Sequence, residues 1–207
     1  PDESTILRFR HRLERHKLAE QMLATVNELL ENKGLLLRQG TAVDATLIAA
    51  PSSTKNKDGK RGPEMHQSKK GKQWYFGMKA HIGVDADSGL VHTVRGTAGN
   101  VSDVVEANSL LHGREVDGYG DSGYQGVEKR PDAKGGIRWH VAMKQSKRRL
   151  LDKTHPVQGL LEKVEKLKAS IRSKVEHPFR VIKRQFGHVK VRYRVLKKNT
   201  QQLHTLF

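Results

Sequence analysis

Three acidic side chains stand where an acid is unusual. Asp44 interrupts the apolar run "TAVDATLIAAP", Asp121 lies among glycines in "GYGDSGYQG", and Glu176 lies near the end of a long helical pattern. Aspartate is disfavoured within strands and is seldom fully buried without a partner. Each acid alone has an ordinary explanation, which is a strand-end turn for the aspartates and an exposed ion pair for Glu176. Together they offer hard oxygen ligands, which suit Mg²⁺ or Mn²⁺.

If these three carboxylates meet in the folded chain, they could support metal-dependent cleavage of a phosphodiester. Three of them can bind two divalent ions roughly 3.5–4 Å apart, which activate an attacking oxygen and stabilise the leaving oxygen when a phosphodiester is cut. The sequence contains no cysteine, so thiolate metal ligands and disulfides are excluded. We therefore predict a site for two Mg²⁺ or Mn²⁺ ions held by Asp44, Asp121 and Glu176.

The charge of the chain indicates the kind of partner. Its 207 residues include 39 Lys and Arg against 22 Asp and Glu, which is a formal net charge of +17. Such an excess is typical of proteins that bind polyanions, most often nucleic acid. An anionic membrane surface is the alternative, but the sequence has no apolar run of spanning length and no signal-peptide pattern. We predict a cytoplasmic, nucleic-acid-binding protein with no membrane partner.

A sheet that positions the aspartates is predicted from the middle of the chain. Strands are expected at 42–48, 75–84, 90–95, within "REVDGYGDSGYQG" and at 137–144. Residues 51–73 have no periodicity and are expected to be a basic loop, which is either a solvated linker or a flexible segment beside a nucleic-acid path. A short helix is expected in "NVSDVVEANSLLHG", before the fourth strand. Three strands, a helix and a strand follow one another as in an RNase H-like core, where the first and fourth strands are neighbours. We therefore predict an α/β, RNase H-like fold with a mixed five-stranded sheet flanked by helices.

Helical patterns flank the predicted sheet on both sides in the sequence. Apolar residues recur at helical spacing near the N-terminus, at Leu18, Met22, Val26 and Leu29. A longer run recurs at i+3 and i+4 over residues 157–175. The sequence thus predicts an N-terminal helical segment and one long helix after the sheet.

The far end of the long helix carries Glu176. Arg172 lies four residues before it and shares its helix face, and Lys183 follows on that face if the helix continues. Pro178 is expected to kink or restart the helix between them. Such a face is most often solvated, with exposed ion pairs. The metal-site hypothesis instead places Glu176 beside the two aspartates, on a helix packed against the sheet.

Three blocks of the sequence resemble a known family. In order and separation, "TAVDATLIAAP", "GYGDSGYQG" and "RSKVEHPFRVIK" resemble the conserved blocks of DDE transposases of the bacterial insertion-sequence-five group. The related insertion-sequence-four group carries the pattern Tyr-x2-Arg-x3-Glu-x6-Lys. Arg172, Glu176 and Lys183 match this spacing, while Ala169 takes the Tyr position. The resemblance extends over nearly the whole chain.

This resemblance implies an activity and a domain organisation. Such an enzyme cuts double-stranded DNA at the terminal inverted repeats of a transposon and joins the freed 3′-hydroxyl to target DNA. Asp44, Asp121 and Glu176 would be its catalytic, metal-binding triad, and the active form would be a homodimer in a bacterial, nucleoid-associated setting. Residues 1–38 would be the helical remnant of a longer N-terminal DNA-binding region, and residues 39–207 the catalytic domain.

Lys and Arg around the triad are the candidate DNA contacts. The stretches "KQSKRRLLDK" and "KRQFGHVKVRYRVLKK" are expected to neutralise phosphates without reading sequence. Alternation in "KVRYRV" predicts either a strand or an extended arm with its basic residues on one side. The predicted DNA-binding residues are Arg172, Lys183, Lys144, Lys147, Arg148, Arg149, Arg180, Arg184, Lys190, Arg192 and Arg194.

The glycines and tyrosines around Asp121 also have expected roles if the chain is such a transposase. Gly118, Gly120 and Gly123 are expected to let the backbone turn sharply and let DNA or metal approach closely. Tyr119 and Tyr124 are expected either to stack on bases or to pack beside the site.

Two other functions stay open. The first is a metal-dependent nuclease that lacks strand transfer, because cleavage and joining use the same carboxylates. The second is a non-catalytic DNA-binding protein, which would be a decayed or domesticated transposase fragment. Mg²⁺-dependent nicking distinguishes the second from the others.

Overall fold

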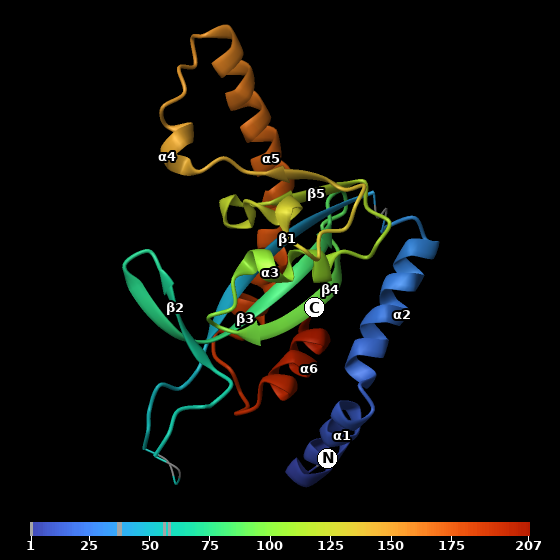
Figure 1. Ribbon diagram of the computed structural model, residues 1–207. Helices are drawn as coiled ribbons and strands as arrows, with labels where there is room; N and C mark the ends of the chain where they lie inside the picture. The colour runs from blue at the N-terminus through green and yellow to red at the C-terminus, as the bar shows by residue number, and fades with distance from the viewer. Residues whose placement is uncertain (1, 37–38, 56, 58) are drawn as a thin grey trace.

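A mixed sheet forms the centre of the molecule. The computed structural model describes residues 2–36, 39–55, 57 and 59–207 (Figure 1). Within these residues the sheet has six strands, namely β1 (Gly40–Ala49), β2 (His66–Lys70), β3 (Gln73–Asp85), β4 (Val91–Ala98), β5 (Asp117–Gly120) and β6 (Arg138–Val141). The order is β2-β3-β1-β5-β6, and β4 also pairs with β3. β3 runs antiparallel to β1, β2 and β4, whereas β5 is parallel to both β1 and β6.

The sheet has one strand more than the five predicted. The extra strand is β2, which lies in the segment 51–73 that was expected to be a loop. It pairs with β3 across a turn at Gly71, whose φ is 62°. β2 is exposed at nearly every position, so it shows no apolar alternation. Because alternation is the main sequence signal for a strand, a solvated hairpin of this kind escapes detection.

Helices cover both faces of the sheet. They are α1 (Glu3–Arg15), α2 (Leu18–Asn32), α3 (Asp103–Glu106), α4 (Gln145–Arg148), α5 (Pro156–Arg180) and α6 (Leu196–Leu206). α5 and α6 pack on one face, and α2 contacts α6 and β4 as an outer layer (Figure 1). None of the helices in the described ranges combines the length and the apolar character needed to cross a membrane.

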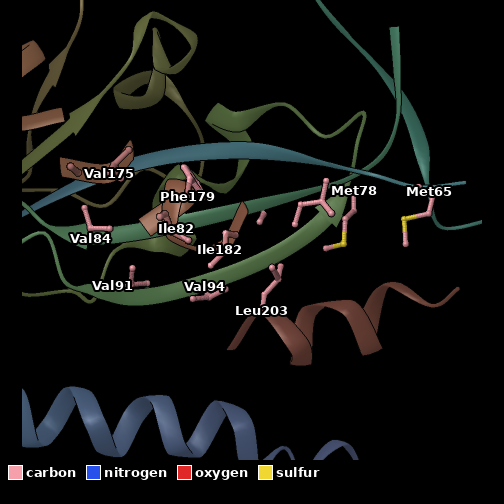
Figure 2. Close-up of a cluster of buried hydrophobic side chains, with 14 residues drawn as sticks. Met65, Met78, Ile82, Val84, Val91, Val94, Val175, Phe179, Ile182 and Leu203 are labelled. Atoms are coloured by element: carbon pink, nitrogen blue, oxygen red, sulfur yellow. The ribbon is translucent and has the colours of Figure 1, made fainter. Parts of the chain in front are cut away.

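Two apolar clusters hold the layers together. Adjacent residues of a strand point to opposite faces, so Ala42 belongs to one cluster and Val43 to the other. The larger cluster joins the sheet to α5 and α6 (Figure 2) through Val175, Phe179, Ile182 and Leu203. The smaller cluster lies on the other face, with α3 and the short 3₁₀ turns η1 (Ala107–Leu110), η2 (Ser122–Tyr124) and η3 (Val127–Lys129).

The long helix does not restart at Pro178. α5 includes this proline, which lacks the N–H that would bond to the carbonyl of Lys174. The chain passes directly into a π-helical turn, η4 (Val181–Gln185), which carries Lys183. The helical path therefore continues from Glu176 to Lys183.

The N-terminal segment is helical as predicted, but most of the apolar residues that indicated the helix lie outside its buried face. The face of α2 turned towards the domain carries Ala19, Leu23 and Asn27, and the Asn27 side chain donates a hydrogen bond to the carbonyl of His92. The predicted apolar residues are instead about half exposed, at Met22, Val26 and Leu29. Periodicity thus indicated a helix but not the face that it buries.

The basic arm after η4 is extended but is not a regular strand. Lys190 forms a single bridge with Ala49, and the Asn199 side chain accepts a hydrogen bond from the backbone N–H of Arg192. Lys190, Arg192 and Arg194 are all exposed, and their display on one side of the arm stays a prediction.

A buried histidine gives the fold a pH dependence. His81 is fully buried on β3, and its Nε2 lies 2.7 Å from Thr97 Oγ1. Burial lowers the pKa of His81 from 6.5 to about 4, although Asp103 and Glu106 oppose the shift. The unfolded chain binds a proton below pH 6.5 and the folded chain does not. We therefore expect His81 to lower the free energy of unfolding by about 3 kcal/mol between pH 6.5 and 4, measured by urea denaturation as the difference between the wild type and His81→Gln.

The control for this prediction is His81→Gln. Glutamine keeps a polar partner for Thr97 but has no proton to gain, so the variant is expected to lose less stability over the same pH range. An unchanged slope would assign the pH dependence to other groups.

Candidate active site

The parallel pairing of β1 with β5 brings the two aspartates together. Ala42 is paired with Tyr119 in this register. Asp44 and Asp121 each follow this pair by two residues, Asp44 within β1 and Asp121 directly after β5, and the two carboxylates are close enough for the charge of Asp121 to act on Asp44. Residues two apart point to the same face, so both carboxylates belong to the face that α5 covers. The predicted neighbourhood of these two strands is confirmed.

Asp44 is a mostly buried carboxylate with little compensating charge. Its Oδ1 accepts a hydrogen bond from the backbone N–H of Ala45 at 2.8 Å, and its Oδ2 lies 4.0 Å from Arg172 Nη1. The pKa of Asp44 is raised to about 6, chiefly by burial and also by the charge of Asp121, while the hydrogen bond from Ala45 and the charge of Arg172 oppose the shift. A cation beside Asp44 would stabilise its ionised form.

Asp121 is oriented by the turn that follows it. Its side chain caps η2, and Oδ1 accepts a hydrogen bond from the backbone N–H of Gly123 at 2.7 Å. A Cβ atom on Gly123 would lie only 2.9 Å from that oxygen. Gly123 therefore serves to hold the carboxylate in place.

The two glycines before Asp121, Gly118 and Gly120, lie directly against aromatic side chains. A Cβ atom on Gly118 would lie 2.9 Å from the Trp139 ring, and one on Gly120 would lie 2.9 Å from the Cβ of Tyr124. These glycines make room for aromatic packing on β5. Close approach of DNA or metal at these positions stays a prediction.

The tyrosines beside Asp121 are used for packing. Tyr124 is fully buried in the smaller apolar cluster. Tyr119 stacks on His140, with the ring centroids 4.9 Å apart. Of the two alternatives for these side chains, packing beside the site is confirmed.

α5 brings Glu176 to this region with Arg172 next to it. Arg172 Nη2 lies 3.6 Å from Glu176 Oε1, so one guanidinium contacts both Glu176 and Asp44. The Glu176 side chain is 62% exposed. Across the described parts of the chain, no three His, Asp or Glu side chains are arranged to hold a metal ion. The structure thus pairs the aspartates and holds Glu176 nearby on Arg172.

The residues present nevertheless suit a hard divalent cation. All three carboxylates offer oxygen ligands, and the buried Asp44 lacks the positive charge that its ionised form requires. Asp44 and Asp121 are the side chains that would hold such an ion.

Lys183 provides a cation on the same face. Its Nζ lies 2.6 Å from the Oγ1 of Thr46, which follows Asp44 by two residues on β1. Burial lowers the pKa of Lys183, and the nearby ammonium group of Lys70 lowers it further. Within the described chain Lys183 has no ion pair, which leaves its charge available to an anion.

A groove with an excess of positive charge runs beside Glu176. Its only acidic side chain is Glu176, and its cationic side chains are Lys70, Arg180, Lys183 and Arg184. Lys70 is not among the DNA contacts predicted by residue, because it lies on β2, in the basic segment that was expected to be a loop. The groove has the charge needed to bind a phosphate backbone next to a carboxylate site.

Comparison with known families agrees with this arrangement. The model of the family described as transposase DDE domain matches residues 36–207. The chain belongs to this family. Membership indicates a DNA-cleaving transposase that binds DNA, and DDE domains normally use divalent metal ions. No solved structure matched the chain.

The predicted DNA contacts near α4 differ in how accessible they are to a phosphate group on this DDE domain. Arg148 makes a bidentate ion pair with Glu162 of α5, at 2.9 and 3.0 Å, which ties α4 to α5. The neighbouring predicted contacts Lys144, Lys147 and Arg149 are exposed. These three side chains, not Arg148, are the cations of this segment that remain open to phosphate.

The strain at Asp44 is testable through stability. A carboxyl group whose pKa is raised on folding destabilises the fold as the pH rises from about 4 to above 6. Asp44→Asn removes the charge, so we expect this DDE domain to gain about 2 to 3 kcal/mol in the free energy of unfolding at pH 8. The gain should vanish below pH 4 in urea denaturation experiments.

Asp117→Asn is the matched control for Asp44→Asn. Hydrogen bonds from His140 and Arg138 lower the pKa of Asp117, so this variant is expected to lose stability at pH 8. Loss of stability in both variants would contradict the assignment of strain to Asp44.

Metal binding is expected without DNA. Addition of Mn²⁺ or Mg²⁺ should raise the melting temperature of the domain, because an ion that binds only the folded state adds about 2.7 kcal/mol at 100 times its Kd. Asp44→Asn and Asp121→Asn should abolish the shift, and Glu176→Gln should weaken it less because Glu176 is paired with Arg172. Asp87→Asn, in an exposed turn, is the control that should keep the full shift.

Proposed function

We propose that this DDE domain cuts DNA at transposon ends and joins the freed 3′-hydroxyl to target DNA, with Asp44, Asp121 and Glu176 as its catalytic carboxylates. The observation that carries the proposal is the register of β1 and β5, which brings Asp44 close to Asp121 beside a cation-lined groove. If the two aspartates held a single ion or a purely structural ion, the groove beside them would not need to be basic.

The sheet supports an RNase H-like fold for the catalytic domain. Three antiparallel strands, β1, β3 and β4, are followed in the chain by the parallel pair β5 and β6. The strand that bears Asp44 lies in the middle of the sheet, between β3 and β5. The catalytic domain is proposed to begin near residue 39, close to the start of the family match at residue 36. An active homodimer and a nucleoid-associated location remain predictions from the resemblance.

The carboxylates at this site would have different roles. Asp44 and Asp121 would hold two Mg²⁺ or Mn²⁺ ions, and Glu176 is the third carboxylate within reach of Arg172. When bound, such ions activate the attacking oxygen and stabilise the leaving one. Gly123 keeps Asp121 oriented through its N–H.

Cationic side chains would position the DNA. Lys183 is anchored by Thr46 and offers its ammonium group to a phosphate on the same sheet face as Asp44. Arg172 lies between two carboxylates and offers a guanidinium next to the cut. Both contacts neutralise backbone charge without reading the base sequence.

Cleavage of labelled transposon-end DNA tests the proposal. In Mn²⁺ or Mg²⁺ the wild-type chain should nick the DNA, and Asp44→Asn, Asp121→Asn and Glu176→Gln should each lower the rate about 1,000-fold or more. This factor corresponds to loss of the several kcal/mol that metal ions contribute to the transition state. Glu128→Gln, an exposed glutamate on the opposite face, should cut at the wild-type rate.

The products separate the three candidate functions. Nicked ends joined to a second DNA indicate transposition, whereas nicks without joined products indicate a nuclease. DNA binding with no metal-dependent nick would refute catalysis and support the non-catalytic alternative.

A further inference from the structure

The β2–β3 hairpin extends beyond the rest of the sheet. The pairing of β3 with β1 ends at Gly77, and its pairing with β4 ends at Met78. Residues 73–75 of β3 are therefore paired with β2 alone, and Phe76 also accepts a hydrogen bond from the backbone N–H of Ala50. In Figure 1 this hairpin stands out at the side of the molecule, away from α2 and α6. Its position leaves both faces of its outer part accessible.

The outer part of the hairpin is strongly basic. Lys69, Lys70 and Lys72 surround the turn at Gly71, and all three side chains are exposed. The sequence has no acidic residue between Glu64 and Asp85, so the charge is not compensated within the hairpin. An exposed, uncompensated group of this kind attracts a polyanion.

Lys70 connects the hairpin to the candidate active site. It lines the same groove as Glu176 and Lys183, although β2 and α5 are far apart in the sequence. The two ammonium groups are close enough for Lys70 to affect the protonation of Lys183. The hairpin is thus one wall of the basic groove and α5 with η4 is the other.

An exposed tryptophan lies beside Lys69, on the face of the hairpin opposite to Lys70, because successive strand residues alternate between faces. Trp74 is 62% exposed, and the Nζ of its cross-strand neighbour Lys69 lies 5.8 Å from the ring centroid. The other tryptophan, Trp139, packs on β5 and is half-buried. Aromatic rings among cations are the combination that binds single-stranded nucleic acid, because the cations neutralise the backbone while a base stacks on the ring.

We propose that the β2–β3 hairpin is a single-strand-binding arm of this DDE domain. Lys70 binds a backbone phosphate in the groove beside Glu176, and Trp74, on the other face of the hairpin, stacks on an unpaired base of the same DNA where the strand passes around the hairpin. The inference rests on the proposed function for the identity of the nucleic acid. It adds that the domain holds an unpaired stretch of DNA close to the cutting site.

Two DNA probes of equal duplex sequence test the stacking. One is blunt and the other carries a short single-stranded 3′ extension, and binding is followed by fluorescence anisotropy in EDTA so that nothing is cut. Stacking on one aromatic ring contributes about 1–3 kcal/mol per base. Trp74→Ala should therefore weaken binding of the extended probe about 5- to 150-fold and leave binding of the blunt probe unchanged.

Matched variants separate stacking from a general surface effect. Trp74→Phe keeps an aromatic ring and should retain most of the affinity for the extended probe. Phe9→Ala removes an equally exposed aromatic side chain, 62%, from α1 and should change neither affinity. Equal losses on both probes, or no loss with Trp74→Ala, would overturn the inference. So would a fall in melting temperature that accounts for the loss.

The salt dependence of binding tests the lysine. Lys70→Ala should reduce the slope of log Kd against log salt by about 0.7 for the extended probe, the value for one phosphate contact in single-stranded DNA. Lys129→Ala, on η3 at the opposite face of the sheet, should leave the slope unchanged. Equal slopes for Lys70→Ala and the wild type would overturn the phosphate contact.

Failure of this inference is distinguishable from failure of the proposed function. The binding assay needs no cleavage, so a chain that never nicks DNA but shows the Trp74 effect supports the hairpin and refutes only catalysis. A chain that nicks DNA at the wild-type rate with Trp74→Ala, and binds both probes unchanged, refutes only the hairpin. A wild-type chain that binds neither probe refutes both.

Discussion

The parallel pairing of β1 with β5 is the contact on which the candidate site depends. It places Asp44 and Asp121, which lie far apart in the sequence, close to each other at neighbouring strands. A slip of one residue in this register would turn one carboxylate to the other face of the sheet. On the other side of β5, Trp139 of β6 packs against Gly118, where a Cβ atom would lie only 2.9 Å from the aromatic ring.

The candidate site contains two charged groups, Asp44 and Lys183, whose charges are not fully balanced by the rest of the chain. Asp44 is buried with only one guanidinium near it, and that guanidinium is shared with Glu176. Lys183 is partly buried with a neutral hydroxyl as its partner and a second lysine nearby. A divalent cation would relieve the first imbalance and a phosphate backbone the second. A domain optimised for stability alone would remove both, since each costs free energy in the absence of ligand.

Helical periodicity predicted the helices of this protein more reliably than the faces that they bury. The apolar residues of α5 illustrate the point, because Val175 is fully buried whereas Leu160 and Leu167 on the same helix are more than 60% exposed. The C-terminal part of α5 packs on the sheet, while its N-terminal part is tied to α4 through Arg148 and Glu162. Spacing along a helix states which residues share a face, and only the neighbouring elements decide whether that face is covered.

The sequence by itself indicated the family, three candidate catalytic acids and most of the helices and strands that carry them. It could do so because short motifs and hydrophobic periods are local properties of the chain. The tertiary structure decided how these parts meet. It places Arg172 between Asp44 and Glu176, and it brings Lys70 to the groove from a hairpin whose polar residues carry no strand signal. Backbone pairing forms that hairpin, and pairing between distant segments depends on contacts that no local pattern encodes.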